Sequence, residues 1–551
     1  MAAPFRLLLT LARWAILVAA VLGPEPASSA AAERPNIIFL LTDDQRDRSI
    51  AAMGHPFVET PHLDALLRDS AWFANAYCAT PVCCPSRVSY FTGMPERVHG
   101  VGFSSSYDLT REQWSRSYPA LLRKAGYHTG FIGKFGVEYY EFRGRASEEF
   151  DYWWAHDGWT KFFPKDHQTP STKPYHRAKN DMITSIMGEA MTEFLESAPR
   201  GKPFCLSVSF NVPHGSQTTS MGVDDPEGRA MRTPANANPR LRGSPFYDTL
   251  YRDIDIPLSP DTAGDPYRFI PKSILDQDLG RRNQTYRYDY EIATCREHQI
   301  RYHQTITGFD HAIGGLRADL ERLGLAGNTV ILFGSDHGLL MGEYGMGGKE
   351  LLLDLASKIP SFVHDPRAPK AARGRKLEQL VSALDYPRTI LDYAGVAAPA
   401  EMEGASLRPL VEGREVPWRD RLFLESLFTL RDNPFQEGIR TKRWKYLRMY
   451  DGVVDFREAD VDFRGRAPEF EMLFDLEADP TEHRNLAAEP AHAAVLAELR
   501  AETAARSESL NRQRTDYLKD HRVARRGTTR ADAAAKKAAR KARPRPAPVL
   551  D

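Results

Sequence analysis

The sequence predicts an α/β protein with a large, mixed but mostly parallel sheet flanked by helices, followed by a smaller C-terminal α+β domain with an antiparallel sheet. From residue 34 to about 400, short apolar runs alternate with helical patterns, which is typical of a parallel sheet. Beyond about residue 410 the apolar runs shorten and turn residues separate them. With 551 residues, the chain is longer than one hydrophobic core usually supports.

Four apolar runs are the expected central strands of the large sheet: residues 36–44, 128–136, 202–215 and 328–338. Between them, residues 60–73 and 314–325 carry apolar residues at helical spacing and are expected to form helices. The C-terminal domain is expected to hold short strands within 421–426, 438–452 and 471–487, followed by a helix at 490–507.

The first 32 residues have the features of a signal peptide. Arg6 precedes an apolar stretch, and small residues suited to cleavage follow near Ala30–Ala32. A membrane anchor is the alternative, but the stretch is shorter than the ~20 residues that a span needs, and Arg13 interrupts it. We therefore predict export: periplasmic or secreted for a bacterial source, and lysosomal or secreted for a eukaryotic one. We expect no membrane span in the mature chain.

The remaining chain divides into an N-terminal domain (33–410), a C-terminal subdomain (411–505) and a basic tail (506–551). The tail is rich in Ala and Pro and is expected to be disordered, although an anion-binding arm is an alternative. The formal net charge is +0, so the composition gives no indication of a nucleic-acid partner.

Polar residues end each of the four central runs. The first run ends in Asp43 and Asp44 and the second in Lys134, whereas the third ends in His214 and the fourth in Asp336 and His337. In open α/β sheets, ligands bind beyond the carboxyl ends of the strands. Helix capping is the simpler explanation for any one of these residues. Adjacent carboxylates repel each other, however, and a hard divalent cation with oxygen ligands would neutralise them.

The cysteines do not form a disulfide framework, because there are five of them without regular spacing: Cys78, Cys83, Cys84, Cys205 and Cys295. The segment Cys83-Cys84-Pro85-Ser86-Arg87 resembles the sulfatase signature Cys-x-Pro-Ser-Arg. Only Cys83 has proline two residues later and arginine four residues later, so Cys84 occupies the variable position.

Further blocks resemble the same family in the same order. They are "NIIFLLTDDQ" with Asp43 and Asp44, "GFIGKFG" with Lys134, "NVPHG" with His214, "TVILFGSDHG" with Asp336 and His337, and "GMGGKELLLDLASKIPSFV" with Lys349. The C-terminal stretches "IRTKRWKYLRMYD" and "EMLFDLEADPTEHRNLA" also resemble family signatures. The resemblance implies an alkaline-phosphatase-like fold and a formylglycine-dependent enzyme that hydrolyses sulfate monoesters, with a sulfated carbohydrate as the expected substrate.

The resemblance also implies the cofactors and the roles of the site residues. Cys83 would be oxidised to formylglycine by a formylglycine-generating or anaerobic sulfatase-maturing enzyme. One calcium ion would be held by Asp43, Asp44, Asp336 and the modified residue 83, with His337 either a further ligand or a hydrogen-bond partner of the substrate or nucleophile. The implied catalytic set is Cys83, Arg87, Lys134, His214 and Lys349.

Two departures and two alternatives remain open at this point. Many sulfatases have a histidine at the position of Gly136. The missing histidine and the double cysteine are similar to the glucosamine-6-sulfatase branch of the family. His337, where some members have asparagine, is instead similar to iduronate-2-sulfatase. A phosphonate or phosphate ester hydrolase with the same nucleophile is one alternative function. A non-catalytic protein that binds sulfated glycans is the other, and the intact Cys83 and Arg87 argue against it.

Overall fold

The computed structural model describes residues 34–102, 109–137, 145–156, 158, 162–166, 172–216, 249–275, 292–427, 433–450 and 467–521. The predicted signal peptide and most of the predicted tail lie outside these ranges. Within the described residues, no helix is both long and apolar enough to cross a membrane.

The larger sheet has eight strands in the order β10-β2-β9-β6-β1-β5-β3-β4. Their bounds are β1 Asn36–Asp43, β2 Ala71–Tyr77, β3 His128–Lys134, β4 Tyr152–His156, β5 Phe204–Pro213, β6 Thr329–Ser335, β9 Phe362–His364 and β10 Arg375–Ser382. All neighbouring strands pair in parallel except β9, which is antiparallel to β2 and β6. The predicted mixed, mostly parallel sheet is confirmed, and the four predicted central runs form β1, β3, β5 and β6.

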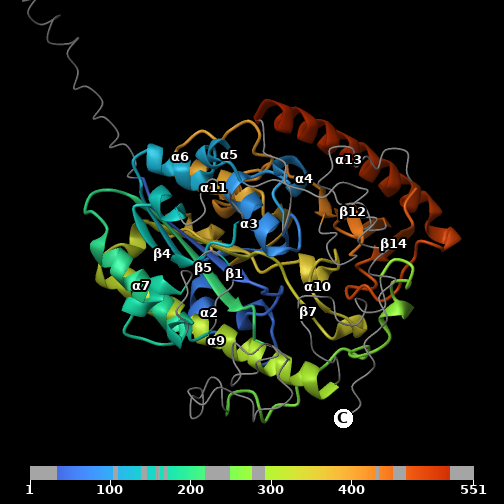
Figure 1. Cartoon of the computed structure of the whole chain (residues 1–551), viewed down its shortest axis with the longest axis horizontal. Helices are drawn as coiled ribbons and strands as arrows, with labels where there is room; N and C mark the ends of the chain where they lie inside the picture. The colour runs from blue at the N-terminus through green and yellow to red at the C-terminus, as the bar shows by residue number, and fades with distance from the viewer. Residues whose placement is uncertain are drawn as a thin grey trace, which may run out of the picture.

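Helices cover both faces of this sheet (Figure 1). α2 (Pro61–Leu67), α7 (Ile183–Ser197) and α9 (Ile292–Arg322) lie on one face, and α3 (Cys83–Thr92), α6 (Tyr118–Lys124) and α11 (Asp385–Ala394) lie on the other. Four further short helices are α4 Glu96–His99, α5 Arg111–Ser115, α10 Asp354–Ser357 and α12 Arg408–Val411. The two-stranded pair β7 (Leu340–Met341) and β8 (Gly347–Gly348) lies in the loop that follows β6.

The predicted helix over 60–73 is wrong in its second half. α2 ends at Leu67, and Ala71–Tyr77 forms β2 instead. This segment is rich in aromatic residues, and it pairs in parallel with β10. Its strand pairing therefore prevails over the local helical spacing.

The C-terminal part forms the predicted antiparallel sheet, with the strand order β11-β12-β13-β14. Its strands are β11 Arg421–Ser426, β12 Phe435–Thr441, β13 Trp444–Tyr450 and β14 Phe470–Asp475. The following helix, α13, spans Ala493–His521 and runs along the outside of this sheet (Figure 1). The helix therefore continues past residue 506, where the sequence predicts the tail to begin, and Leu510 within it is buried.

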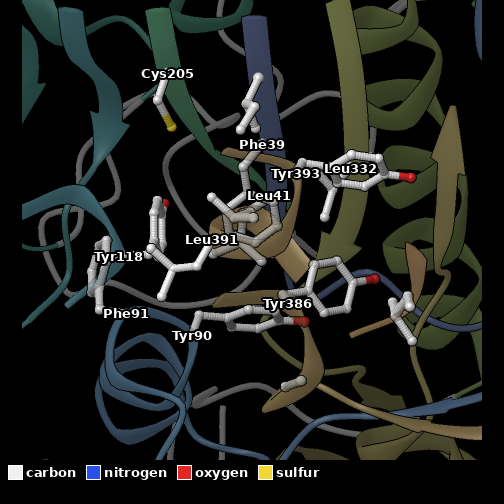
Figure 2. Close-up of a cluster of buried hydrophobic side chains, with 14 of the residues drawn as sticks. Phe39, Leu41, Tyr90, Phe91, Tyr118, Cys205, Leu332, Tyr386, Leu391 and Tyr393 are labelled. Carbon is white, nitrogen blue, oxygen red and sulfur yellow. The ribbon is translucent and has the colours of Figure 1, made fainter. Parts of the chain in front are cut away.

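A buried aromatic cluster fixes α3 to the sheet (Figure 2). The ring of Phe39 on β1 lies 5.3 Å from that of Tyr90 on α3 and 5.4 Å from that of Tyr386 on α11. The hydroxyl of Tyr90 donates a hydrogen bond to the carbonyl of Ser335 at 2.8 Å, and that of Tyr386 donates to the carbonyl of Phe333 at 2.7 Å. Because both hydroxyls bind the backbone of β6, the helix that begins at Cys83 has a fixed position relative to the strand ends.

Candidate active site

The carboxyl ends of the central strands bring the predicted acids together. The backbone N–H of Asp336, just after β6, donates to the carbonyl of Thr42 on β1 at 3.0 Å. On the other side of β1, the N–H of His214 donates to the carbonyl of Asp43 at 3.0 Å. Asp43, Asp44 and Asp336 are all fully buried. Three carboxylates therefore share one enclosed region at the carboxyl ends of the central strands.

The turn after β1 directs the second carboxylate into the same region. Asp44 has a φ of 69°, a left-handed conformation that aspartate adopts more readily than most residues. Its N–H donates to Asp336 Oδ1 at 3.2 Å. The turn thus ties the two acid-bearing loops directly to each other.

Cys83 is the first residue of α3 and lies against these acids, with 4% of its surface exposed. Its Sγ atom is 2.8 Å from Lys349 Nζ, 3.3 Å from His337 Nε2 and 3.8 Å from Asp43 Oδ1. A helix N-terminus carries partial positive charge, so this position favours a negatively charged or strongly polar group.

Arg87 lies one helical turn after Cys83 and binds several parts of the site. Its Nε donates to Asp336 Oδ2 at 3.0 Å, and its Nη1 donates to the carbonyl of Lys134 at 2.8 Å and to the hydroxyl of Ser209. Its Nη2 is 3.5 Å from Asp43 Oδ2. The buried guanidinium therefore connects α3 with the ends of β1, β3, β5 and β6.

Two buried lysines balance the remaining acid charge. Lys134 at the end of β3 pairs with Asp43, and Lys349 Nζ lies 3.0 Å from Asp44 Oδ1. Burial alone would raise the pKa of Asp43, but the positive charges of Lys134, Arg87 and Lys349 outweigh it and hold that pKa well below its usual value. Burial alone would lower the pKa of Lys349, yet the negative charges of Asp44, Asp43 and Asp336 raise it well above normal.

The two histidines of the site have opposite electrostatic surroundings. Burial lowers the pKa of His214 to about 4, so its imidazole is neutral at pH 7. Burial also acts to lower the pKa of His337, but the negative charge of Asp336 prevails and raises it to about 9. His337 Nδ1 lies 3.2 Å from Asp44 Oδ1. His337 therefore connects the acid cluster, which consists of Asp43, Asp44 and Asp336, with the sulfur of Cys83.

The donor atoms of this cluster fit a hard divalent cation. One ligand atom from each of Asp43, Cys83, Asp336 and His337 lies within 4.8 Å of the others, and the same holds for the set Asp43, Asp44 and His214. Each set contains two carboxylates, and carboxylate oxygens are the ligands that calcium and magnesium prefer. The structure thus places all the sequence-predicted site residues around one point, including Arg87, Lys134 and Lys349.

Gly136 does not supply a side chain to the site, and its surroundings leave little room for one. A Cβ atom added there would lie 2.9 Å from Arg87 Cδ and 3.2 Å from Lys134 Cε. Its φ of 63° is also a conformation that favours glycine.

The sequence gives no indication of a role for Gln436, a buried residue of the C-terminal sheet. Its Nε2 donates to the carbonyl of Glu350 at 3.0 Å, and its Oε1 accepts from the N–H of Leu352 at 3.1 Å. Glu350 itself has a φ of 74°, and its N–H donates to the carbonyl of Pro81 at 3.1 Å. Gln436 therefore holds the loop that carries Lys349. Because the two segments lie far apart in the sequence, no local signal predicts this contact.

Comparison with known proteins decides the assignment. The family model described as "Sulfatase" matches residues 35–396, which is more than half of the chain. The chain belongs to the sulfatase family. It is accordingly a sulfuric ester hydrolase. A second model, described as "N-sulphoglucosamine sulphohydrolase, C-terminal", matches residues 342–509 of this sulfatase.

Curated relatives share most of the sulfatase chain. An arylsulfatase from Clostridium perfringens is 28% identical over 490 residues, covering 82% of this chain and 90% of the relative. An N-acetylglucosamine-6-O-sulfatase from Bacteroides thetaiotaomicron is 26% identical over 530 residues, covering 88% of this chain and 87% of the relative. A solved structure in complex with its substrate D-glucosamine-2-N,6-O-disulfate aligns with a TM-score of 0.64 at 22% identity, over 88% of this chain and 98% of that one. At that identity the structural likeness supports the fold alone.

The Gln436 contacts generate a first prediction. Gln436→Leu should release the loop that carries Lys349 and displace the Lys349 ammonium group. The kcat of this sulfatase for an aryl sulfate should then fall by about ten- to a hundredfold, because small misplacements of a charged active-site group have effects of this size. The measurement is steady-state kinetics combined with thermal unfolding. Gln113→Leu is the matched control, because Gln113 is also buried and makes two hydrogen bonds, to Thr110 N and His99 O, away from the Lys349 loop. Equal kcat losses in both variants would contradict a specific role for Gln436.

Proposed function

We propose that this sulfatase hydrolyses sulfate monoesters of carbohydrates, with Cys83 converted to formylglycine and one calcium ion bound at the acid cluster. One observation carries the proposal: the side chain of residue 83 lies at a helix N-terminus, between the carboxylate of Asp43 and the ammonium of Lys349. The side chain of residue 83, the proposed nucleophile, therefore lies between the proposed cation site at Asp43 and the proposed anion site at Lys349. Export of the chain, predicted from residues 1–32, is part of the same proposal.

The charges of the site suit a sulfate ester. The ester carries a negative charge, so an anionic nucleophile approaches it poorly and the site has to supply positive charge. Lys134 and Lys349 would bind its non-bridging oxygens, where charge builds up as the ester bond breaks. Both ammonium groups are buried, where charge-assisted hydrogen bonds are stronger than in water.

The proposed modification explains why a cysteine occupies this position. A hydrated formylglycine aldehyde supplies two hydroxyl groups on one carbon, one to attack sulfur and one whose deprotonation allows sulfate to leave. Serine or unmodified cysteine would lack the second hydroxyl group. Arg87 would hold residue 83 in place and offset negative charge there, as it already binds Asp336 and approaches Asp43.

Asp43, Asp44, Asp336 and residue 83 would hold the calcium ion, with His337 beside them. A bound calcium ion would act as a Lewis acid toward a sulfate oxygen and lower the pKa of a hydroxyl group at residue 83. His214, whose pKa burial lowers to about 4, is neutral at pH 7 and would donate a hydrogen bond from its ring N–H to the leaving oxygen.

The carbohydrate assignment comes from the relatives rather than from the pocket. One relative is named an N-acetylglucosamine-6-O-sulfatase, and the aligned solved structure holds a disulfated glucosamine. We extend this substrate class to the present protein. The proposal covers sulfated carbohydrates as a class and does not specify the sugar, the sulfate position, or exo or endo action on a glycan.

The modification gives the second prediction. In active protein, the peptide containing residue 83 should be ~18 Da lighter than the unmodified peptide, the mass difference between cysteine and formylglycine. Cys83→Ala should remove turnover of 4-nitrophenyl sulfate. Cys84→Ala is the matched control, because the Cys84 sulfur faces the carbonyl of Gly102 and should leave both mass loss and turnover in place. An unmodified thiol in fully active protein would refute the proposal.

The cation site gives the third prediction, which does not depend on activity. Adding calcium to chelator-treated protein should raise its melting temperature, since a ligand at about 100 times its Kd stabilises by about 2.7 kcal/mol. Asp44→Asn should abolish most of this increase. Asp392→Asn, at a partly exposed acid that contacts Ser406, should preserve it. An equal calcium response in both variants would place the ion elsewhere.

The substrate class gives the fourth prediction. Side-by-side kinetics should show higher kcat/KM for at least one sulfated mono- or disaccharide than for 4-nitrophenyl sulfate, a phosphate diester or a phosphonate monoester. The panel should include sugars sulfated at different positions. Preference for the phosphonate over every sulfate would instead favour the phosphonate hydrolase alternative.

A further inference from the structure

His156 lies beside the candidate active site but has no part in the proposed mechanism. It is the last residue of β4 and is the register partner of Lys134 on β3. The N–H of Phe135 donates to the carbonyl of His156 at 2.8 Å. Register partners on neighbouring strands direct their side chains to the same face of a sheet, so the imidazole and the lysine side chain lie next to each other.

The two ring nitrogens of His156 differ in their partners. Nδ1 is hydrogen-bonded to the hydroxyl of Tyr175. Nε2 is buried and has no hydrogen-bond partner among the described residues. Only 2% of the His156 surface is exposed, so bulk water does not compensate for the missing partner. A buried polar group without a partner is costly, and the most direct remedy is a ligand that binds there.

The surroundings of Tyr175 indicate which nitrogen carries the proton. Tyr175 packs in an apolar cluster with Trp154 and Phe162, and burial raises the pKa of its hydroxyl well above the usual value. The hydroxyl therefore keeps its proton, and His156 Nδ1 is its hydrogen-bond partner. We assign this proton as donated to Nδ1, which leaves the imidazole proton on Nε2.

The charges around His156 indicate what Nε2 can bind. Burial, together with the positive charges of Lys134 and Arg87, lowers the pKa of His156 to about 3, so the ring is neutral and offers one N–H. Neither lysine nor arginine can accept a hydrogen bond. Arg87 Nη1 donates to the carbonyl of Lys134, the register partner of His156, so both cations lie near this N–H donor at the ends of β3 and β4. Together they form a set that suits an anionic oxygen.

We propose that His156 is a further substrate-binding residue, whose Nε2–H donates a hydrogen bond to an oxygen of the sulfate group next to Lys134. This inference rests on the proposed function. It explains a buried donor that the strand pairing places beside the anion site, and it assigns Tyr175 as the residue that sets the orientation and tautomer of the ring.

The test compares His156→Phe, which keeps a ring but removes the donor, with His156→Gln, which keeps an N–H donor. Removing a hydrogen bond to a charged group should lower kcat/KM for 4-nitrophenyl sulfate by about ten- to a hundredfold in the Phe variant. The inhibition constant of inorganic sulfate, a direct measure of anion binding, should rise by a similar factor. The Gln variant should retain more of both properties.

Two further variants separate binding from folding. His128→Phe is the matched control, because His128 begins β3 and stacks on Phe194 at the other end of the same sheet. It should leave kcat/KM and sulfate inhibition within about twofold of wild type, the range expected for a substitution away from the site. Tyr175→Phe should weaken sulfate inhibition, and adding it to His156→Phe should cause little further loss, because both residues act through one contact.

The outcomes distinguish this inference from the proposed function. A folded His156→Phe variant with wild-type kcat/KM and sulfate inhibition would overturn the role of His156 while leaving the sulfatase mechanism intact. If His156→Phe does not fold, Tyr175→Phe decides, and unchanged sulfate inhibition in that variant would overturn the inference. Wild-type protein without formylglycine or without turnover would instead refute the proposed function.

Discussion

Three buried carboxylates are the constraint on which the rest of this structure depends. Asp43, Asp44 and Asp336 would repel one another strongly without compensation, because few water molecules can screen charge in an enclosed site. The chain supplies Arg87, Lys134 and Lys349 from three separate elements, and each contacts at least one of these acids. A bound divalent cation would take over part of that compensation and free the lysines to bind an anion. The same charges that hold the site together thus prepare it for a sulfate ester.

The fold satisfies this constraint because segments that are far apart in the sequence meet at the carboxyl ends of the central parallel strands. Backbone pairing of β1 with β5 and β6 sets the spacing of the acids, and the aromatic cluster around Phe39 sets the position of α3. The C-terminal sheet contributes as well, because Gln436 and Pro81 both bind the backbone of Glu350, the residue after Lys349. The second sheet is therefore part of the active-site framework rather than a separate module.

Much of this arrangement could be predicted from the sequence, because apolar runs ending in polar residues identify buried parallel strands and their functional ends. The sequence also indicated Cys83 and Arg87, whose spacing on one helix is local. It did not indicate β2, where aromatic residues overlap a helical pattern, nor the three-residue strand β9. The sequence did not indicate the roles of Gln436 and His156 for a different reason. Each gains its role from contacts with segments far away in the chain, and neither has a neighbouring motif that distinguishes it from an ordinary buried polar residue.

The burial of Cys83 has a consequence for the order of events during biosynthesis. The residue begins a helix packed on the sheet, and Lys349, with its loop held by Gln436, lies against its sulfur. A separate enzyme would find little of this thiol accessible once the chain has folded. Residues around 83 leave the ribosome long before residues 349 and 436, so the nascent chain exposes the thiol for a limited time. The proposed oxidation of Cys83 therefore has to compete with folding, and the yield of mature protein would depend on the relative rates of these two processes.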